Sequence, residues 1–321
     1  MSLTVSRFVL GEDESEWNAF VDNAKNSTFL FNRSFMDYHK DRFDDYSLII
    51  REGDAIVGCL PANQITESKI ASHQGLTYGG LIVSQDARLL SVMEIFRSML
   101  EYLANNGVEV LEYKSFPRFY NSLSTDEVDY TLFRLNAELY RRDTAIAVRQ
   151  GYQLPYQNRR KRAIKKAIKA GVVIEETDQL DEFYNEVLSP VLQARHGVDP
   201  VHSLKELKKL KTAFPNQIRQ FNALIEGKVV AGTTVFESNQ VAHAQYIAVV
   251  DEGMKLGAND YLFSYLIENT FRDKDFFDFG ICNEDAGRTL NKGLLEWKEG
   301  FGARSYAHDF YRIETASYPN L

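Results

Sequence analysis

The sequence predicts a mixed α+β protein in which two similar domains follow each other. Two hairpin patterns, residues 46–60 with Glu-Gly-Asp at the turn and residues 221–236 with Glu-Gly-Lys at the turn, indicate pairs of antiparallel strands. After each hairpin the pattern changes to strand, helix and strand, which favours one parallel pair. Each domain is therefore expected to contain a mixed, mostly antiparallel sheet flanked by helices.

Hydrophobic spacing predicts the elements of the N-terminal half. Between residues 12 and 25, apolar residues recur at the i, i+3, i+4 and i+7 positions of a helix. Residues 89–105 are amphipathic, and the Asn-Gly pair that follows them is a helix stop signal. The expected elements of this half are helices at 12–25, 35–43 and 89–105, the hairpin at 46–60, strands at 69–72, 78–83 and 108–113, and two further strands within 130–148.

The C-terminal half repeats this order. Its expected elements are helices at 158–171, 180–192, 205–211 and 260–271, the hairpin at 221–236, and strands at 172–176, 241–250 and 276–280. Corresponding positions, at an offset that changes slowly along the chain, are Gly58 and Gly232, Tyr78 and Tyr246, and Glu112 and Asp278. Two copies of one domain with loops of different length would give such an offset. We place an N-terminal domain at residues 1–150 and a C-terminal domain at residues 151–321.

Composition indicates a globular protein of a reducing compartment. The chain has 321 residues, of which 44% are hydrophobic and 26% charged, and no stretch has the length and apolarity of a membrane span. The N-terminus lacks the apolar core of a signal peptide. With two cysteines, Cys59 and Cys282, the sequence favours a cytoplasmic location over a disulfide framework.

One strongly basic segment stands out in a chain whose net charge is −8. Residues 158–171 carry seven positive charges and no acidic residue. The net charge argues against a general nucleic-acid coating protein. It also means that positive charge has been concentrated on one predicted helix.

Three stretches of the C-terminal half resemble the Gcn5-related N-acetyltransferases (GNAT), and in particular their doubled forms, the FemAB-type transferases and CelD-like acetyltransferases. The first is the basic helix and its continuation, residues 160–172. The second is the helix start at 257–262 together with the strand end at 277–280. The third is the segment 293–302, which is similar to the family's Gly-Leu-x-x-Phe-Lys-x-x-Phe-Gly.

The resemblance implies transfer of an acyl or aminoacyl group to an amine. Single-copy members bind the pyrophosphate of acyl-CoA on a glycine-containing turn at a helix N-terminus, where backbone N–H groups and the helix dipole attract phosphate. The counterpart here is the turn 254–259, which keeps the central glycine but not the opening and closing residues of the pattern. The predicted donor-binding residues are Lys255, Gly257, Ala258, Asn259 and Tyr246. The N-terminal counterpart has no glycine, so that degenerate copy is not expected to hold CoA.

Lys298 is the first candidate for catalysis, because the matching lysine of the FemAB-like motif is implicated in stabilising the oxyanion of acyl transfer. It lies next to an aromatic residue, Trp297, which is a candidate for contact with the substrate; a surface lysine beside a core tryptophan is the alternative. Asp278 and Glu284 are candidates for accepting the proton of the amine or binding its ammonium form. A structural salt bridge and a solvated loop are the respective alternatives.

The remaining candidates concern substrate binding. Arg159, Arg160 and Arg162, at the start of the basic helix, suit contacts with phosphate, whether of CoA, a nucleotide sugar, a lipid-linked acceptor or tRNA. Asn283, in the polar loop that follows the strand 276–280, is expected to contact the substrate. No grouping of Cys and His has the spacing of a metal site, so no metal is predicted.

Three functions remain open at this point. The first is direct transfer of an acyl group, most simply acetyl, from acyl-CoA to a primary amine such as an amino sugar or a peptide. The second is aminoacyl-tRNA-dependent transfer onto a cell-wall precursor, as in FemAB-type enzymes. The third is a non-catalytic binding protein that kept the fold.

Overall fold

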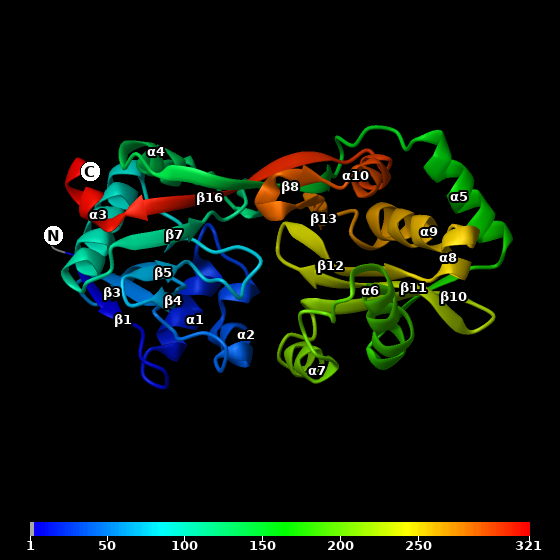
Figure 1. Cartoon of the computed structure of the whole chain (residues 1–321), viewed down its shortest axis with the longest axis horizontal. Helices are drawn as coiled ribbons and strands as arrows, with labels where there is room; N and C mark the ends of the chain where they lie inside the picture. Colours follow the sequence, from blue (N-terminus) through cyan, green and yellow to red (C-terminus); the bar gives the residue numbers. More distant parts are fainter. Residues whose placement is uncertain (1–2) are drawn as a thin grey trace. The chain divides into compact units, whose positions relative to one another are not determined.

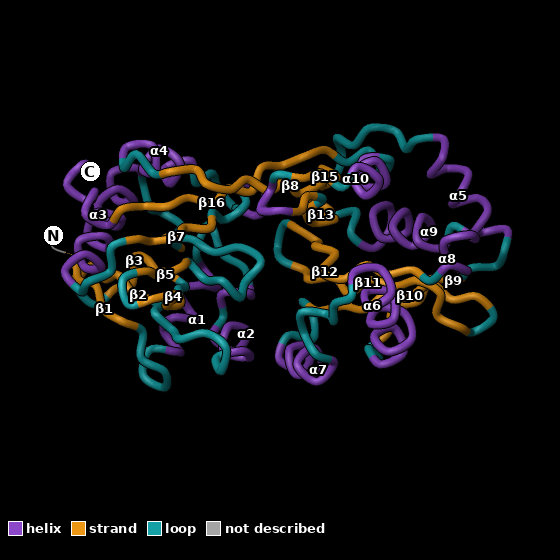
Figure 2. The backbone as a smooth tube through the Cα atoms, viewed as in Figure 1, coloured by secondary structure: helices purple, strands orange, loops and turns teal. Residues whose placement is uncertain are grey.

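The structure, a computed structural model, describes residues 3–321. The chain forms two compact units (Figures 1 and 2). The N-terminal unit comprises the residues up to Asp143 together with Ala307–Leu321, and the C-terminal unit comprises Thr144–Tyr306.

The helices are α1 (Glu14–Asn23), α2 (Arg33–Met36), α3 (Leu89–Asn105), α4 (Asp126–Arg134), α5 (Asn158–Lys169), α6 (Ser189–His196), α7 (Leu204–Ala213), α8 (Asp251–Leu256), α9 (Ala258–Tyr265) and α10 (Lys292–Glu299). Shorter helical segments are the 3₁₀ turns η1 (Phe29–Phe31), η2 (Asp37–His39), η3 (Arg118–Tyr120), η6 (Asp285–Gly287) and η7 (Thr315–Asn320), and the π-helical turns η4 (Phe183–Leu188) and η5 (Leu266–Thr270). The strands are β1 (Leu3–Arg7), β2 (Leu48–Glu52), β3 (Ala55–Leu60), β4 (Asn63–Thr66), β5 (Lys69–Ala71), β6 (Ile82–Val83), β7 (Val110–Lys114), β8 (Glu138–Arg149), β9 (Val173–Thr177), β10 (Ile218–Ile225), β11 (Lys228–Glu237), β12 (Val241–Val249), β13 (Phe276–Ile281), β14 (Asn283–Glu284), β15 (Thr289–Leu290) and β16 (Arg304–Glu314).

The strands of the N-terminal unit belong to two different sheets. One has the order β1-β2-β3-β6, and the other contains β4-β5-β7-β16. β5 and β7 are parallel, and the pairs β1–β2, β2–β3, β3–β6, β4–β5 and β7–β16 are antiparallel. The apolar face of α3 supplies buried residues such as Phe96 and Leu100 to a core shared with Leu48 and Ile50 of β2.

The C-terminal unit has one sheet with helices on both faces. The strand order is β13-β12-β11-β10-β9, and residues of β8 pair with the outer edge of β13. β12 and β13 are parallel, and the other pairs are antiparallel. Figure 1 shows α9 on one face of β10–β12 and α6 and α7 on the other. The main core lies under α9, where Leu262, Phe263 and Leu266 pack with Phe221 and Phe277.

The parallel strands of each unit pair over three residues and then part. In the C-terminal unit the last pair is His243 with Asp278. In the N-terminal unit the last pair is Ala71 with Glu112. The predicted correspondence of Glu112 with Asp278 therefore holds at the level of strand register. Tyr78 does not correspond to Tyr246 in this way, because Tyr78 lies in the loop between β5 and β6.

Helix α5 approaches α9 unusually closely at Gly257. This residue joins α8 to α9 with a φ of +81°. A Cβ atom at Gly257 would lie 2.5 Å from the carbonyl oxygen of Ala163 in α5. Glycine is required here for two reasons: the positive φ angle is unfavourable for other residues, and there is no room for a Cβ atom.

The mixed, mostly antiparallel sheets confirm the predicted fold class. Within residues 130–148 the structure differs from the prediction of two strands: α4 ends at Arg134, and β8 is a single long strand. Three acidic residues in the first turn of α4 and the burial of Val128 and Leu132 explain why this segment is helical. The expected helix at 35–43 is also shorter, since α2 gives way to a 3₁₀ turn that ends at His39.

The predicted domain boundary at residue 150 remains a prediction, but the compact units differ from it at both ends. Residues 307–321 belong to the N-terminal unit although the sequence placed them in the second domain. The reason is strand pairing, because Phe310–Glu314 of β16 pairs with β7. β8 similarly passes from Asp143 of the N-terminal unit to Thr144 of the C-terminal unit.

Replacing Gly257 by alanine tests the contact between α5 and α9. We expect Gly257→Ala to lower the free energy of unfolding by roughly 2–4 kcal/mol, because it adds overpacking to the cost of a positive φ. Gly171 is a matched control, since its φ is +82° and a Cβ atom there would meet nothing within 4 Å. Denaturant unfolding of both variants measures the difference. Equal losses in the two variants would contradict the proposed contact.

Candidate active site

The candidate site lies where β12 and β13 part, and it is organised around Gly280. This residue has a φ of +73°, which turns the chain out of the register that β13 keeps up to Asp278. Its N–H donates to Oδ1 of Asp278 at 2.7 Å, and its carbonyl accepts from Nζ of Lys298 at 2.9 Å. A Cβ atom on Gly280 would lie 3.3 Å from Cε1 of His243. Three polar side chains from β12, β13 and α10 thus meet at one glycine.

Lys298 is a buried cation with a specific pair of acceptors. Its side chain extends from α10, is 2% exposed, and donates to the carbonyl oxygens of Gly280 and Ile281 at 2.9 and 2.6 Å. Burial lowers the pKa of Lys298 to about 8, against the opposing effect of the nearby Asp278. One of its three N–H bonds has no acceptor among residues 3–321. Lys298 is therefore not the surface lysine of the alternative interpretation, and it retains a donor for a substrate atom.

Asp278 and His243 form a hydrogen-bonded pair across the parallel strands. Oδ2 of Asp278 lies 2.8 Å from Nδ1 of His243, and the two side chains are 4% and 12% exposed. With Nδ1 engaged, Nε2 of His243 has no protein partner in the described part of the chain. An imidazole that is oriented by a carboxylate and keeps one nitrogen available has the arrangement of a general base. Asp278 thus orients His243, which is not among the site residues predicted from the sequence.

Trp297 belongs to an aromatic cluster beneath the site. Its ring lies 5.2–5.5 Å from the rings of Phe263, Phe279 and Phe301, with interplanar angles of 75–88°. Edge-to-face contacts of this kind stabilise aromatic cores. The structure therefore gives Trp297 the packing role of the alternative interpretation, in which it holds α10 against α9 and β13.

Tyr246, Asn283 and Glu284 lie in less reactive settings. The hydroxyl of Tyr246 lies 2.6 Å from Nδ1 of His202 and accepts the N–H of the same residue at 3.0 Å, which ties β12 to the loop between α6 and α7. Asn283 is buried and accepts the N–H of Thr144 at 2.7 Å. Glu284 is exposed and lies within 3.3 Å of the amide of Asn291. No contact brings Glu284 to Lys298 among the described residues.

The predicted donor turn is covered by α5. Gly257, Ala258 and Asn259 are buried, whereas Lys255 is exposed. Asn259 stands where the family pattern has glycine or alanine, and its Oδ1 atom is buried without a hydrogen-bond partner within residues 3–321. The N-terminus of α9 therefore shows no open cradle of the kind that binds pyrophosphate.

Arg160 and Asp260 close this region with a buried ion pair. Burial raises the pKa of Asp260 and lowers that of Arg160, and in each case the partner opposes the shift. Asp260 also accepts a hydrogen bond from its own backbone N–H, so a carboxylate of the protein already occupies part of the α9 N-terminus. Arg159 and Arg162 lie on the exposed face of α5 and have no ion-pair partner in the described part of the chain.

The N-terminal unit lacks this combination of groups where its parallel strands part. Ala71 stands where β12 has His243, and Glu112 binds Lys69 and Arg312 at 3.4 and 3.6 Å. Beyond this point Ser72 continues to pair with β7 through a backbone bond to Glu112 of 2.9 Å. At this point the N-terminal unit therefore carries an alanine and an ion-paired carboxylate in place of the His243–Asp278 pair.

No group of three or more His, Cys, Asp and Glu side chains within residues 3–321 is placed to hold a metal ion. No helix in the same range combines the length and apolarity needed to cross a membrane.

Replacing Lys298 by methionine tests the buried ammonium through the pH dependence of stability. Folding lowers the pKa of this lysine from 10.5 to about 8, so the unfolded chain binds more protons between these values and stability rises with pH across this window. The penalty is full below about pH 8 and corresponds to roughly 3 kcal/mol. In denaturant unfolding, the wild type should gain stability relative to Lys298→Met as the pH rises. The exposed Lys292 of the same helix, changed to methionine, is the control; parallel pH curves for wild type and Lys298→Met would refute the assignment.

Comparisons with known proteins agree with this geometry. Residues 156–299 match the family described as an acetyltransferase (GNAT) domain. No curated protein matches the chain. A solved structure of FemX is similar over 95% of this chain and 96% of its own, with a TM-score of 0.66 and 11% identity. L-PGS from Bacillus licheniformis is similar over 96% and 94%, with a TM-score of 0.62 and 13% identity.

A conserved protein of unknown function from Bacteroides thetaiotaomicron is similar over 98% of this chain and 100% of its own, with a TM-score of 0.58 and 11% identity. At such low identities these likenesses concern the fold. The matched domain contains β12, β13 and most of the candidate site, including Lys298. Residues 156–299 therefore form a domain that matches the GNAT acetyltransferases, and the chain as a whole has the FemAB-like tandem fold that the sequence predicted.

Proposed function

We propose that the C-terminal unit transfers an acyl group, most simply acetyl, directly from acyl-CoA to a primary amine. The observation that carries the proposal is the meeting of Lys298, Asp278 and His243 around Gly280, at the point where β12 and β13 part. A gap between two parallel strands offers unpaired backbone groups that can hold the amide groups of an extended donor arm. Lys298 and His243 would then lie beside the reacting carbonyl.

In the proposed reaction the neutral amine attacks the carbonyl carbon of the thioester. The C–N bond forms, the carbonyl oxygen becomes an oxyanion, and the C–S bond then breaks to release the thiolate of CoA. The third N–H bond and the charge of Lys298 stabilise the oxyanion. Nε2 of His243 accepts the proton of the amine, while Asp278 holds the imidazole and stabilises its charged form. No covalent enzyme intermediate is needed.

An aminoacyl-tRNA donor is the second candidate, and the cover of the donor turn favours it. α5 and Asp260 occupy the region where the pyrophosphate of CoA would meet the α9 N-terminus. The outer face of α5 offers an alternative site for phosphate, because six exposed cations there have no ion-pair partner within residues 3–321. They are Arg159, Lys161, Arg162, Lys165, Lys166 and Lys169. Under this candidate the cell-wall precursor would be the acceptor.

Substitutions at the candidate site test the mechanism. We expect Lys298→Met to lower kcat by about 10²–10³-fold, because one oxyanion donor is lost. We expect His243→Gln to lower kcat by about 10²–10⁴-fold, because the proposed base is lost. Steady-state kinetics with an amine acceptor measures both, with Lys292→Met as the matched control for Lys298. Wild-type kcat values in both variants would refute the mechanism.

Ligand-induced stabilisation separates the two donors. If acyl-CoA is the donor, a concentration about a hundred times its Kd should stabilise the native protein by roughly 2.7 kcal/mol and raise Tm. Asp260→Asn should strengthen this effect, because the variant removes a carboxylate that competes with pyrophosphate. If aminoacyl-tRNA is the donor, CoA should leave Tm unchanged, and tRNA should bind in a salt-sensitive manner that Arg162→Glu weakens. An exposed lysine outside α5, Lys209, changed to glutamate, controls for net charge.

A further inference from the structure

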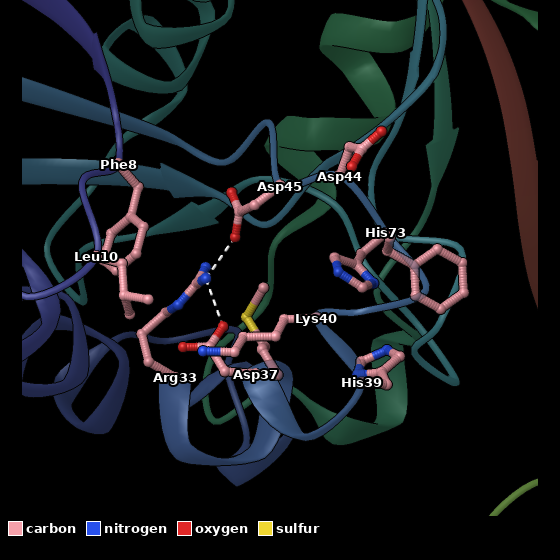
Figure 3. Close-up of a pocket in the computed structure, with 11 residues that line it drawn as sticks. Phe8, Leu10, Arg33, Asp37, His39, Lys40, Asp44, Asp45 and His73 are labelled. Atoms are coloured by element: carbon pink, nitrogen blue, oxygen red, sulfur yellow. Dashed lines mark hydrogen bonds and ion pairs between the residues drawn. The ribbon is translucent and has the colours of Figure 1, made fainter.

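A pocket of about 220 Å³ lies in the N-terminal unit and is independent of the site described above. Its walls come from the end of β1, from α2 and the turn after it, from the loop before β2, and from His73 after β5 (Figure 3). The volume is below that of pockets for drug-sized ligands, so the pocket suits a molecule of about one ring. Segments far apart in the sequence thus form one small cavity with both charged and apolar side chains in its walls.

The pocket has more negative than positive charge. Arg33 is 2% exposed, and its guanidinium binds both Asp37 and Asp45, which leaves it no net charge to offer an anion. Figure 3 shows these two carboxylates on either side of the Arg33 head group. Lys40 and Asp44 also line the pocket, and neither has an ion-pair partner among residues 3–321. Three carboxylates therefore face two cations.

His73 contributes a hydrogen-bond donor. Its side chain is 4% exposed, and burial together with the neighbouring His39 lowers its pKa to about 3, so the ring is neutral. Nδ1 accepts the N–H of Gly75 at 3.2 Å, which places the proton of the neutral ring on Nε2. That N–H has no acceptor in the described part of the chain. The backbone of His73 also has a φ of +131°, and strain in a non-glycine residue is typical of ligand sites.

Phe43 and Met36 form an apolar part of the pocket wall. Gly75 holds this wall close, because a Cβ atom there would lie 2.0 Å from His39 and 2.6 Å from Phe43. The aromatic ring of Phe43 is therefore held against the loop that contains His73. The ring centroids of Phe43 and His73 are 5.5 Å apart. The pocket is preformed and combines a flat apolar wall with polar groups around it.

We propose that this pocket binds one amino-sugar ring. The ammonium group of the sugar forms an ion pair with the carboxylate of Asp44. Its hydroxyl groups donate hydrogen bonds to Asp37 and Asp45, and a ring or hydroxyl oxygen accepts one from His73. The C–H face of the sugar lies against Phe43. A phosphate or a carboxylate would instead meet an excess of negative charge, and a purely apolar molecule would leave the carboxylates without donors. The proposed binding does not rest on the proposed function.

Calorimetric titration of the full chain with glucosamine, glucose and lysine tests the proposal. We expect glucosamine to bind with one site, and glucose and lysine each to bind at least about tenfold more weakly, because each lacks the ammonium or the ring. Asp44→Asn should weaken glucosamine binding by about tenfold or more. Asp41→Asn, an exposed neighbour that does not line the pocket, should not. Equal binding of glucose, tighter binding of lysine, or no effect of Asp44→Asn would overturn the proposal.

A second titration separates this inference from the proposed reaction. Lys298→Met should bind glucosamine as the wild type does, although we expect it to transfer acyl groups poorly. Binding without any acyl transfer in the wild type would contradict the proposed function and leave the sugar site intact. Acyl transfer to an amine without any binding of glucosamine would refute the sugar site alone.

Discussion

The candidate site depends on one backbone constraint, the turn of β13 at Gly280. Up to Asp278 the strand pairs with β12 on one side and β8 on the other, and a residue with a positive φ then redirects it. The redirected carbonyls of Gly280 and Ile281 need donors, and Lys298 supplies them from α10. A buried ammonium costs free energy, as its lowered pKa indicates, and two carbonyl oxygens offset part of this cost. The same turn places the Gly280 N–H on Asp278 and thereby holds the carboxylate toward His243.

The two units use the same strand geometry for different purposes. Each has a lysine whose pKa is lowered to about 8 by desolvation, the buried Lys298 in the C-terminal unit and the partly buried Lys114 in the N-terminal unit. Lys114 donates to the carbonyls of His73 and Leu76, which fastens the loop after β5 against β7. Lys298 instead caps carbonyls of the strand that leaves the sheet. The N-terminal unit is thus closed where the C-terminal unit offers reactive side chains, and its own pocket lies elsewhere, beside α2.

The basic helix α5 serves two purposes on two faces. On its inner face Arg160 forms an ion pair with Asp260, and Ala163 lies against Gly257. This face is therefore part of the packing around α9. Its outer face presents cations that have no protein partner among residues 3–321. The contacts of the inner face cover the α9 N-terminus. The cations of the outer face are exposed and could bind a phosphate-bearing donor. An acyl-CoA donor would need the α9 N-terminus that the inner face of α5 covers, whereas an aminoacyl-tRNA donor could bind the cations of the outer face.

Local signals in the sequence determined the fold class, the two hairpins, several helices and two residues of the site, although α4 lies in a segment predicted as strand. Tight hairpin turns and helical spacing act over a few residues, and the motif around Lys298 and the strand around Asp278 are continuous in the chain. The sequence could not determine that Asp278 orients His243, because this pair is made by the register of two parallel strands 35 residues apart.

Only the tertiary structure decided the roles of Trp297, the donor turn and the N-terminal pocket. Trp297 lies next to Lys298 in sequence, but helix geometry turns it into the aromatic core. Gly257 is part of a family pattern, but the close approach of α5 covers it. The charge balance at Arg33 and the neutral His73 depend on burial and on partners from separate segments. Residue types and their spacing are local properties, whereas burial, pairing and access arise only when distant segments pack together.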